Sequence, residues 1–279
     1  MNHTMQPIEY TNVGSSSSSS VTSESSAVGD LRARYLDLLR DSLTGLDRDD
    51  PAIAMRVGGG LEPFDRTRRV EGRDWPATAL TMIGAKRALQ LQRAVEFVIE
   101  RGVPGDLVET GVWRGGACIL MRGVLAAYGV VDRRVWVADS FRGLPEPDAA
   151  RYPKDAGNRL CAFGQLAVSA DAVRANFERY RLLDDQVRFL EGWFRDTLPA
   201  APIERLAILR LDGDLYESTM DALTALYDRL SPGGIVIVDD DGALESCRAA
   251  VSDFRRERGI TETIHRIDDS GVHWQRRPA

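Results

Sequence analysis

Carboxylates gather directly after two apolar segments in the second half of the chain. Asp212 and Asp214 follow the segment LAILRL, and Asp239, Asp240 and Asp241 follow GGIVIV. Apolar runs of this length are typical of parallel strands that are buried on both faces of a sheet. Ligands of open α/β sheets bind just beyond the carboxyl ends of such strands, so we expect these side chains to meet at one edge of the sheet. Crowded carboxylates raise one another's pKa unless a cation lies between them, which predicts an all-oxygen site for Mg²⁺ or Ca²⁺.

A purely structural interpretation of the same acidic residues stays open at this stage. Asp212, Asp239 and Asp241 could serve as turn residues or helix N-caps, because the aspartate side chain often accepts a hydrogen bond from nearby backbone N–H groups. The sequence alone does not decide between a ligand and a cap at each of these positions.

A glycine-containing turn precedes the acidic cluster by about a hundred residues. The segment DLVETGVWRGGA predicts a strand, a turn and a helix start, and Gly111, Gly115 and Gly116 would let the backbone come close to a ligand there. The spacing G-x-x-x-G-G differs from the G-x-G-x-x-G of dinucleotide sites, and Glu109 would repel a pyrophosphate. A carboxylate in this place suits a sulfonium or ammonium group, which disfavours a nicotinamide-dependent reductase.

Two further strand ends offer polar side chains for a nucleoside. Asp139 ends the segment VWVAD, at the position where an acidic residue accepts hydrogen bonds from ribose hydroxyls, although it could equally cap the turn before Ser140. After the next strand, Glu191, Gly192 and Trp193 are candidates for an adenine-facing edge, with core packing as the alternative for Trp193.

Composition excludes several classes of protein. The chain has 279 residues, of which 43% are hydrophobic, and a formal net charge of -6, which argues against nucleic acid as the main partner. No apolar run approaches the roughly 18 residues that a membrane span requires. The spacing of Cys118, Cys161 and Cys247 fits neither a disulfide framework nor a zinc site, and predicts reduced thiols in a cytoplasmic protein.

The sequence divides into three parts. Residues 1–29 are polar, include six consecutive serines, and are predicted to be a disordered tail or an expression scar. Residues 30–77 should form a helix with Asp30 as N-cap, followed from residue 47 by a loop or mobile lid. The helix places several apolar residues on one face, which could cover the pocket or join two copies of the chain in a homodimer: Leu31, Tyr35, Leu38, Leu39 and Leu43.

Residues 78–279 should form the ligand-binding domain. A helix is predicted over 78–101, and strands and helices then alternate in the doubly wound manner of an α/β fold. Strands are expected over 106–112, 135–140, 187–190, 206–211 and 234–238. The sequence DSG between the segments 263–267 and 271–275 indicates a closing antiparallel hairpin.

At these residues the chain resembles the Mg²⁺-dependent sugar O-methyltransferases of antibiotic biosynthesis, the macrocin and mycinamicin group. The resemblance covers roughly residues 81–276, and the order of its segments makes it specific. It is carried by TMIGAKRALQLQ, VPGDLVETGVWRGGACI, VWVADSFRGLP, YRLLDDQVRFLEGWFRDTLP, LAILRLDGDLYESTMDAL, LSPGGIVIVDDD and GVHWQRR.

This resemblance implies a Rossmann-like class I methyltransferase with a mostly parallel seven-stranded sheet and an antiparallel C-terminal hairpin. Its methyl donor would be S-adenosyl-L-methionine, and Mg²⁺ would bind Asp214, Asp239 and Asp240, with Asp214 also the general base. The residues implied for the donor are Glu109, Thr110 and Gly111 at the methionine part, Asp139 and Ser140 at the ribose, and Glu191, Gly192 and Trp193 at the adenine.

The implied substrate is a small-molecule glycoside in which a deoxysugar hydroxyl is methylated. A metal that chelates two adjacent hydroxyls would lower the pKa of the acceptor and orient it. Among the family's substrates we favour the 4-hydroxyl of a noviose sugar on an aminocoumarin over a macrolide sugar. A catechol-type phenolic O-methyltransferase is the alternative enzyme, and a non-catalytic cofactor-binding scaffold the alternative class, against which the acidic cluster argues.

Overall fold

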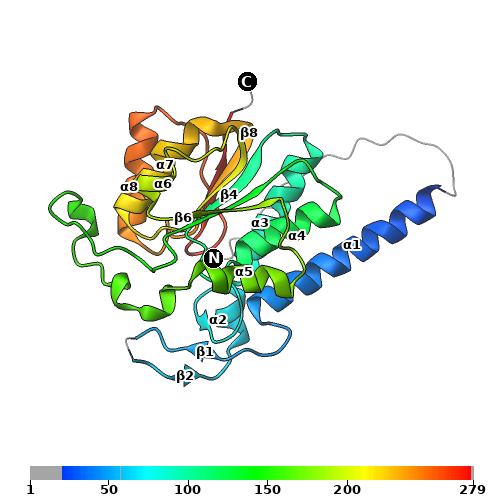
Figure 1. Ribbon diagram of the computed structural model, residues 1–279, viewed down its shortest axis with the longest axis horizontal. Coiled ribbons are helices and arrows are strands. Elements are labelled where there is room, and N and C mark those ends of the chain that lie inside the picture. The colour runs from blue at the N-terminus through cyan, green and yellow to red at the C-terminus, as the bar shows by residue number, and fades with distance from the viewer. Residues whose placement is uncertain (1–20, 57, 278–279) are drawn as a thin grey trace, which may run out of the picture.

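A seven-stranded sheet runs through the centre of the molecule, in the order β6-β5-β4-β7-β8-β10-β9 (Figure 1). The computed structural model describes residues 21–56 and 58–277, with side chains described from residue 27 onward. Neighbouring strands from β6 to β8 are parallel, and β10 is antiparallel to both of its neighbours, which confirms the predicted fold. The strands are β4 (Asp106–Thr110), β5 (Val135–Asp139), β6 (Val187–Glu191), β7 (Leu206–Leu211), β8 (Leu230–Val238), β9 (His265–Arg266) and β10 (Val272–Gln275).

Helices cover both faces of this sheet because successive strand residues point to opposite sides. Leu107 belongs to the apolar cluster on one face, and Val108 belongs to the cluster on the other. The first face packs against α1 (Val21–Thr44), α3 (Gly84–Glu100), α4 (Gly116–Ala127) and α5 (Ala170–Arg179). The second face carries α6 (Phe194–Thr197), α7 (Tyr216–Leu226), the short 3-10 helix η4 (Tyr227–Arg229) and α8 (Glu245–Glu257).

The first helix differs from its prediction at its start and on its surface. It begins at Val21, so residues 21–29 belong to the helix and Asp30 is an exposed interior residue instead of its N-cap. No apolar periodicity runs through residues 21–29, so the sequence contained no signal for this extension. Of the five apolar residues expected on one face, only Leu39 and Leu43 are buried, and the others are exposed. The rest of the predicted tail, residues 1–20, lies outside the described residues.

The segment 47–75 was predicted to be a loop or mobile lid without regular structure, but it contains short strands and a helix. It forms a small antiparallel sheet, in the order β2-β1-β3, and a short helix: β1 (Ala52–Ile53), β2 (Leu61–Glu62), β3 (Trp75–Pro76) and α2 (Arg66–Val70). Arg69 of α2 is fully buried and donates to both carboxylate oxygens of Asp74 and to the carbonyls of Thr44 and Asp50. Such contacts between distant residues leave no periodic pattern in the sequence.

The predicted helix over 78–101 starts later than expected, at Gly84. The backbone N–H groups of Thr78 and Ala79 donate to the carboxylate of Asp50, and those of Leu80 and Thr81 donate to the carbonyl of Leu43. These hydrogen bonds tie residues 78–81 to the end of α1 and to Asp50, so the backbone groups of this segment are paired outside a helix.

Candidate active site

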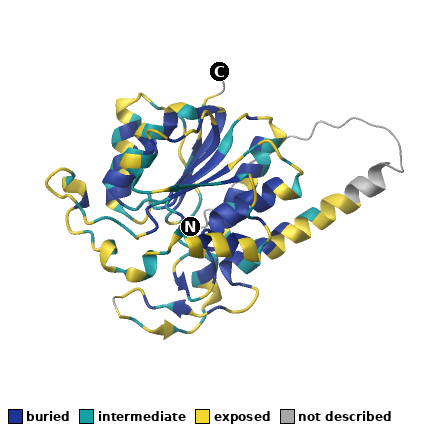
Figure 2. Cartoon of the chain, in the orientation of Figure 1, coloured by how far each residue is buried: buried dark blue, intermediate teal, exposed yellow. Residues whose placement is uncertain are grey.

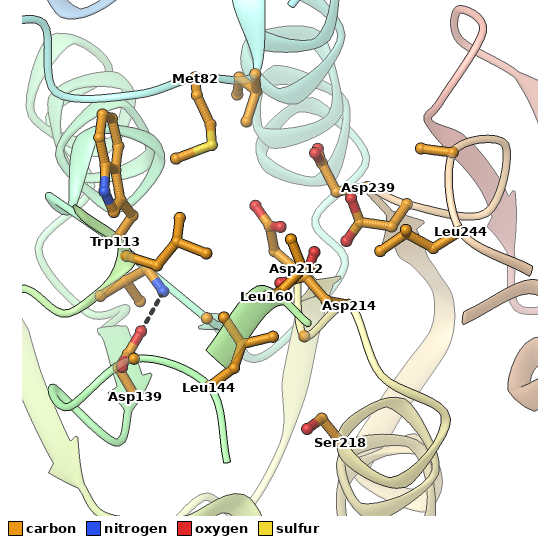
Figure 3. Close-up of a pocket in the computed structure, with 18 of the residues that line it drawn as sticks. Met82, Trp113, Asp139, Leu144, Leu160, Asp212, Asp214, Ser218, Asp239 and Leu244 are labelled. Carbon is orange, nitrogen blue, oxygen red and sulfur yellow. Dashed lines mark hydrogen bonds between the residues drawn. The ribbon is translucent and has the colours of Figure 1, made fainter. Parts of the chain in front are cut away.

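A pocket of about 290 Å³ opens at the carboxyl ends of the four central strands, β5, β4, β7 and β8. One wall consists of strand-end residues, another of residues 72–75 and 81–83, and a third of the connection between β5 and α5. Figure 3 shows the aspartates that line it: Asp212, Asp214 and Asp239 lie at one end, while Asp139 lies with Trp113 at the other. The pocket is thus divided into an acidic end and a glycine-turn end.

Three carboxylates converge at the acidic end. Asp212, Asp239 and Asp240 each offer an oxygen, and these oxygens all lie within 4.8 Å of one another. The cause is sheet register, because Leu211 at the end of β7 pairs with Val238 at the end of β8, and the residues that follow are therefore neighbours. The sequence-based ligand set shares Asp239 and Asp240 with this group. Asp212, which was considered a structural residue, takes the third place.

Asp214 lies beside this group but not within it. The chain turns sharply after β7, with a hydrogen bond from the Leu215 N–H to the Gly213 carbonyl, and Asp214 adopts a left-handed φ of 60°. Burial and the nearby carboxylates, Asp212 first among them, raise the pKa of Asp214 well above its usual range. Asp214 is thus a half-buried carboxylate with a high proton affinity beside the three-oxygen group.

The same crowding affects the three converging residues. Burial, and then the charge of Asp239, raise the pKa of Asp212 to about 6. Burial and the charges of Asp214, Asp212 and Asp239 raise the pKa of Asp240 well above its usual range. The Oδ2 atom of Asp240 is buried and has no hydrogen-bond partner among the described residues. An orphaned carboxylate oxygen in an all-oxygen set fits a hard divalent cation such as Mg²⁺.

Two buried arginines partly neutralise the acidic end, and the sequence analysis missed both. Arg210 of β7 binds Glu109, Asp212 and Asp239, and Arg87 of α3 binds the other carboxylate oxygen of Asp239. Strand pairing places Arg210 directly beside Glu109, so the two side chains share one face of the sheet. The available signal was an arginine inside the otherwise apolar strand LAILRL, because a buried guanidinium requires anionic partners.

Glu109 therefore has a different environment from the one expected. Its carboxylate faces Arg210 and also accepts a hydrogen bond from the Cys118 thiol, at 2.9 Å. Burial raises the pKa of Glu109 to about 7, and the charge of Arg210 opposes that shift. Glu109 still lines the pocket, but its nearest cationic partner belongs to the protein itself.

The glycines of the turn are needed mainly for contacts within the protein. Gly111 has a φ of 88°, and a Cβ there would lie 1.7 Å from the Asp212 carbonyl oxygen. A Cβ on Gly115 would meet Val173, and one on Gly116 would meet the Leu80 carbonyl. Of the three, only Gly111 lines the pocket, and close packing within the protein accounts for Gly115 and Gly116.

Asp139 anchors the loops at the glycine-turn end. One carboxylate oxygen accepts the Val112 N–H and the other accepts the Phe141 N–H, both at 2.7 Å. The Ser140 hydroxyl donates to the Gly143 carbonyl at 2.7 Å. Asp139 thus makes the turn-capping contacts of the alternative interpretation, and both residues also line the pocket.

The other predicted donor-binding residues divide into two groups. Trp193, which precedes α6, lines the pocket. Thr110, Glu191 and Gly192 are not among the lining residues, and Glu191 is exposed.

The connection between β5 and α5 forms one side of the pocket. It contains three short 3-10 helices, η1 (Pro153–Asp155), η2 (Leu160–Ala162) and η3 (Gly164–Leu166). The buried Asp155 accepts the N–H groups of Tyr216 and Glu217 at the start of α7, at 2.6 and 3.0 Å. The Trp113 indole donates to the Gln165 carbonyl at 2.9 Å. These contacts fix an apolar roof over the pocket, made of Leu144, Pro145, Leu160 and Leu166.

Comparison with known proteins agrees with this architecture. The family model described as macrocin O-methyltransferase (TylF) matches residues 53–276. The chain belongs to this family of O-methyltransferases.

Characterised relatives match nearly the whole of this O-methyltransferase. A tetracenomycin-C-type enzyme of Streptomyces olivaceus, the 8-demethyl-8-(2,3-dimethoxy-alpha-L-rhamnosyl)-tetracenomycin-C 4'-O-methyltransferase, is 57% identical over 90% of this chain and 95% of its own length. The demethyldecarbamoylnovobiocin O-methyltransferase of Streptomyces niveus is 54% identical over 87% of this chain and 93% of its own. The solved structure of the O-methyltransferase NovP superposes with a TM-score of 0.84 at 53% identity, covering 88% of this chain and 99% of NovP.

Within the described part of this O-methyltransferase, none of the helices combines the length and apolar character needed to span a bilayer.

Proposed function

We propose that this O-methyltransferase transfers a methyl group from S-adenosyl-L-methionine to the 4-hydroxyl of a deoxysugar on a glycosylated antibiotic precursor. The observation that carries the proposal is the acidic end of the pocket, where three carboxylates converge beside a fourth of raised pKa. The names of the relatives support the acceptor class, since one acts on a rhamnosyl 4' position and another on a novobiocin precursor. The noviose of an aminocoumarin remains the acceptor that the sequence resemblance favours.

Asp212, Asp239 and Asp240 would hold Mg²⁺, and the buried Oδ2 of Asp240 is the oxygen that fits this role best. When bound, the cation would supply Lewis acidity to the acceptor hydroxyl, whose pKa is otherwise too high for deprotonation at neutral pH. Arg87 and Arg210 orient Asp239 from both sides, which holds one member of the ligand set in place.

Asp214 is the residue that we propose as general base. It lies outside the three-oxygen group, so its carboxylate remains available to accept a proton. Trp113 and Asp139 line the opposite end of the pocket, where the methyl donor would bind, so a hydroxyl near Asp214 would face the sulfonium methyl. Apolar residues of the connection between β5 and α5 also line this space, and they would limit the water beside the reacting hydroxyl.

The acceptor requires a second oxygen next to the reacting hydroxyl if the metal is to chelate it. The name of the tetracenomycin relative describes a rhamnose that already has methoxy groups at positions 2 and 3. For this chain we therefore propose chelation of the 4-hydroxyl together with a neighbouring oxygen, which could be a hydroxyl or an ether.

An acceptor panel with labelled S-adenosyl-L-methionine tests the proposal directly. It should contain demethyldecarbamoylnovobiocin, the 2,3-dimethoxyrhamnosyl tetracenomycin, a demethylated macrolide glycoside and a catechol, each with Mg²⁺ and with EDTA. We expect Mg²⁺-dependent methylation of a deoxysugar glycoside, located at O4 by mass spectrometry and NMR. Methylation of the catechol alone would contradict the acceptor class, and full activity in EDTA would contradict the metal.

The base is tested with Asp214→Asn, because asparagine tolerates the left-handed backbone of this position. We expect kcat to fall by about 10²-fold or more while the affinity for Mg²⁺, measured by calorimetry with S-adenosylhomocysteine present, stays near that of the unaltered enzyme. Near-normal turnover would contradict this role. Loss of Mg²⁺ binding would instead make Asp214 a metal ligand, as the resemblance implied.

A cytoplasmic location is part of the proposal. It is supported by the three cysteines, which are all free, two of them buried in the core beside the sheet.

A further inference from the structure

The turn of the C-terminal hairpin, residues 268–271 between β9 and β10, lies against the acidic end of the pocket. β10 is antiparallel to β8, with Val272 paired to Val238, so the residues before Val272 meet the residues that follow Val238. The end of β8 is buried in the centre of the molecule (Figure 2). Ser270 of the turn lines the pocket, as Asp239 does. Sheet pairing thus brings this turn, which the sequence indicates only as a hairpin, to the proposed metal site.

The turn and the loop that follows β8 are joined by close contacts. The Ser270 hydroxyl donates to the Asp239 carbonyl at 2.6 Å, and the Gly242 N–H donates to the Ser270 carbonyl at 2.7 Å. A Cβ on Gly242 would lie 2.0 Å from the Asp269 carbonyl oxygen, so the two segments come as close as a glycine permits. The position of the loop that carries Asp239 and Asp240 therefore depends on the turn.

Asp268 makes a second connection, through a buried charge. Its Oδ1 atom accepts the N–H groups of Ser270 and Gly271, at 2.9 and 2.7 Å, which stabilises the turn. Its Oδ2 atom is buried, accepts no hydrogen bond from the described residues, and lies 3.1 Å from Nε of Arg87. The Asp268 side chain is 5% exposed. One oxygen of Asp268 thus shapes the turn, while the other faces Arg87.

Arg87 is held between Asp268 and Asp239. Its Nη1 atom binds Asp239, its Nε atom faces Asp268, and its Nη2 atom donates to the Gly72 carbonyl at 3.0 Å. A Cβ on Gly271 would lie 2.9 Å from Cδ of Arg87, so the turn also packs against this side chain. The charge of the guanidinium is shared between two carboxylates. Without Asp268, it would act on Asp239 alone.

We propose that the turn 268–271 positions the metal-binding end of the pocket, with Asp268 as a positioning residue that acts on Asp239 through Arg87. This inference rests on the proposed function, because it takes Asp239 as a ligand of Mg²⁺. Asp268 opposes the charge of Arg87, and Asp239 therefore keeps the negative potential that a divalent cation needs. Removing an outer carboxylate of this kind typically lowers metal affinity by about 10- to 100-fold.

Calorimetry with Mg²⁺, in the presence of S-adenosylhomocysteine, tests the role of Asp268. Asp268→Asn keeps an oxygen for the turn but removes the charge that faces Arg87. We expect Kd and KM for Mg²⁺ to rise about tenfold, while kcat at saturating Mg²⁺ stays within about twofold. The matched control is Asp269→Asn, because the Asp269 side chain is 64% exposed and pairs with Arg73 and Arg266. Its Kd for Mg²⁺ should stay within about twofold of the unaltered value.

The outcomes separate this inference from the proposed function. If the unaltered protein binds Mg²⁺ and Asp268→Asn binds it equally well, the inference is overturned and the proposed function stands. An equal rise in Kd for Asp269→Asn, or a loss of kcat with unchanged KM for Mg²⁺, would also overturn the inference. If Asp268→Asn does not fold, Ser270→Ala tests the same connection without altering a buried charge. We expect its Kd for Mg²⁺ to rise about threefold, and an unchanged Kd would overturn the inference.

A measurement without metal decides the case in which the unaltered protein binds no Mg²⁺, a result that would contradict the proposed metal. Urea denaturation in EDTA compares Asp268→Asn, Asp239→Asn and the double variant. We expect the double variant to lower the urea midpoint by more than the sum of the two single shifts, because Arg87 is then buried without either carboxylate. Additive shifts would show that Asp268 does not act on Asp239 through Arg87, and would overturn the inference.

Discussion

The two ends of the pocket differ in how far their polar groups are already satisfied. At the glycine-turn end, both carboxylate oxygens of Asp139 accept backbone N–H groups, and Gly115 and Gly116 pack against the protein. At the acidic end, three carboxylates crowd together, and Asp240 has a buried oxygen without a partner in the described structure. Both ends of the pocket lie at the carboxyl ends of parallel strands. Unsatisfied polar groups, more than residue type, therefore indicate where a ligand supplies the missing interaction.

The acidic end should show the largest effect of a single substitution. Asp240→Asn removes one of the three converging carboxylates with little change in shape, and we expect kcat/KM to fall by about 10³-fold because charge stabilisation at the reacting oxygen is lost. The matched control is Asp241→Asn, since the adjacent Asp241 does not line the pocket. Steady-state kinetics with saturating Mg²⁺ measure kcat/KM for both variants. Equal losses of kcat/KM in Asp240→Asn and Asp241→Asn would contradict the role of Asp240 in the three-carboxylate group.

Removing the buried guanidinium of Arg210 should lower the stability of the protein by an amount of similar size. Glu109 and Asp239 both form ion pairs with Arg210, and Arg210→Met removes both pairs. Breaking such a buried network lowers the free energy of unfolding by about 3–5 kcal/mol. Urea denaturation measures the free energy of unfolding. Arg205→Met, an exposed arginine just before the same strand, should change it by less than about 0.5 kcal/mol. A loss below about 1 kcal/mol for Arg210→Met would show that the network is dispensable.

A smaller effect is expected at the glycine-turn end. Asp139→Asn keeps one acceptor oxygen but turns an amide N–H₂ toward a backbone N–H, so we expect a loss of about 1–2 kcal/mol in the free energy of unfolding. Asp132→Asn, an exposed residue before the same strand, serves as the control. An unchanged melting temperature for Asp139→Asn would contradict the anchoring role and leave only the predicted contact with ribose.

The smallest effect should come from Glu191, which was predicted to contact the donor. Its side chain is exposed and outside the pocket lining, so Glu191→Gln should change KM for S-adenosyl-L-methionine by less than about threefold. Trp193→Ala, two residues further on and in the lining, should raise that KM by about tenfold through lost aromatic contact. A larger rise in this KM for Glu191→Gln than for Trp193→Ala would indicate that the adenine binds nearer to Glu191.

The sequence was sufficient for the fold and for part of the site. Apolar runs and glycine turns predicted the parallel strands, since burial on both faces leaves a local signature in composition. The aspartates at the strand ends were identified for the same reason, and the family was evident from the order of the segments. The fold of segment 47–75 was missed because Arg69 binds the carbonyls of Thr44 and Asp50, which lie 25 and 19 residues away in the chain.

Only the tertiary structure decided which carboxylates converge. Asp212 and Asp214 are two residues apart and would share a face if the strand continued, but the chain turns at Gly213 and gives Asp214 a left-handed backbone. The neutralising arginines arrive from β7 and from α3, whose relative positions depend on packing across the sheet. Sequence thus determined the elements and their chemistry, because these follow from local periodicity. The pairing of charges at their ends depended on distances between segments far apart in the chain, which periodicity does not encode.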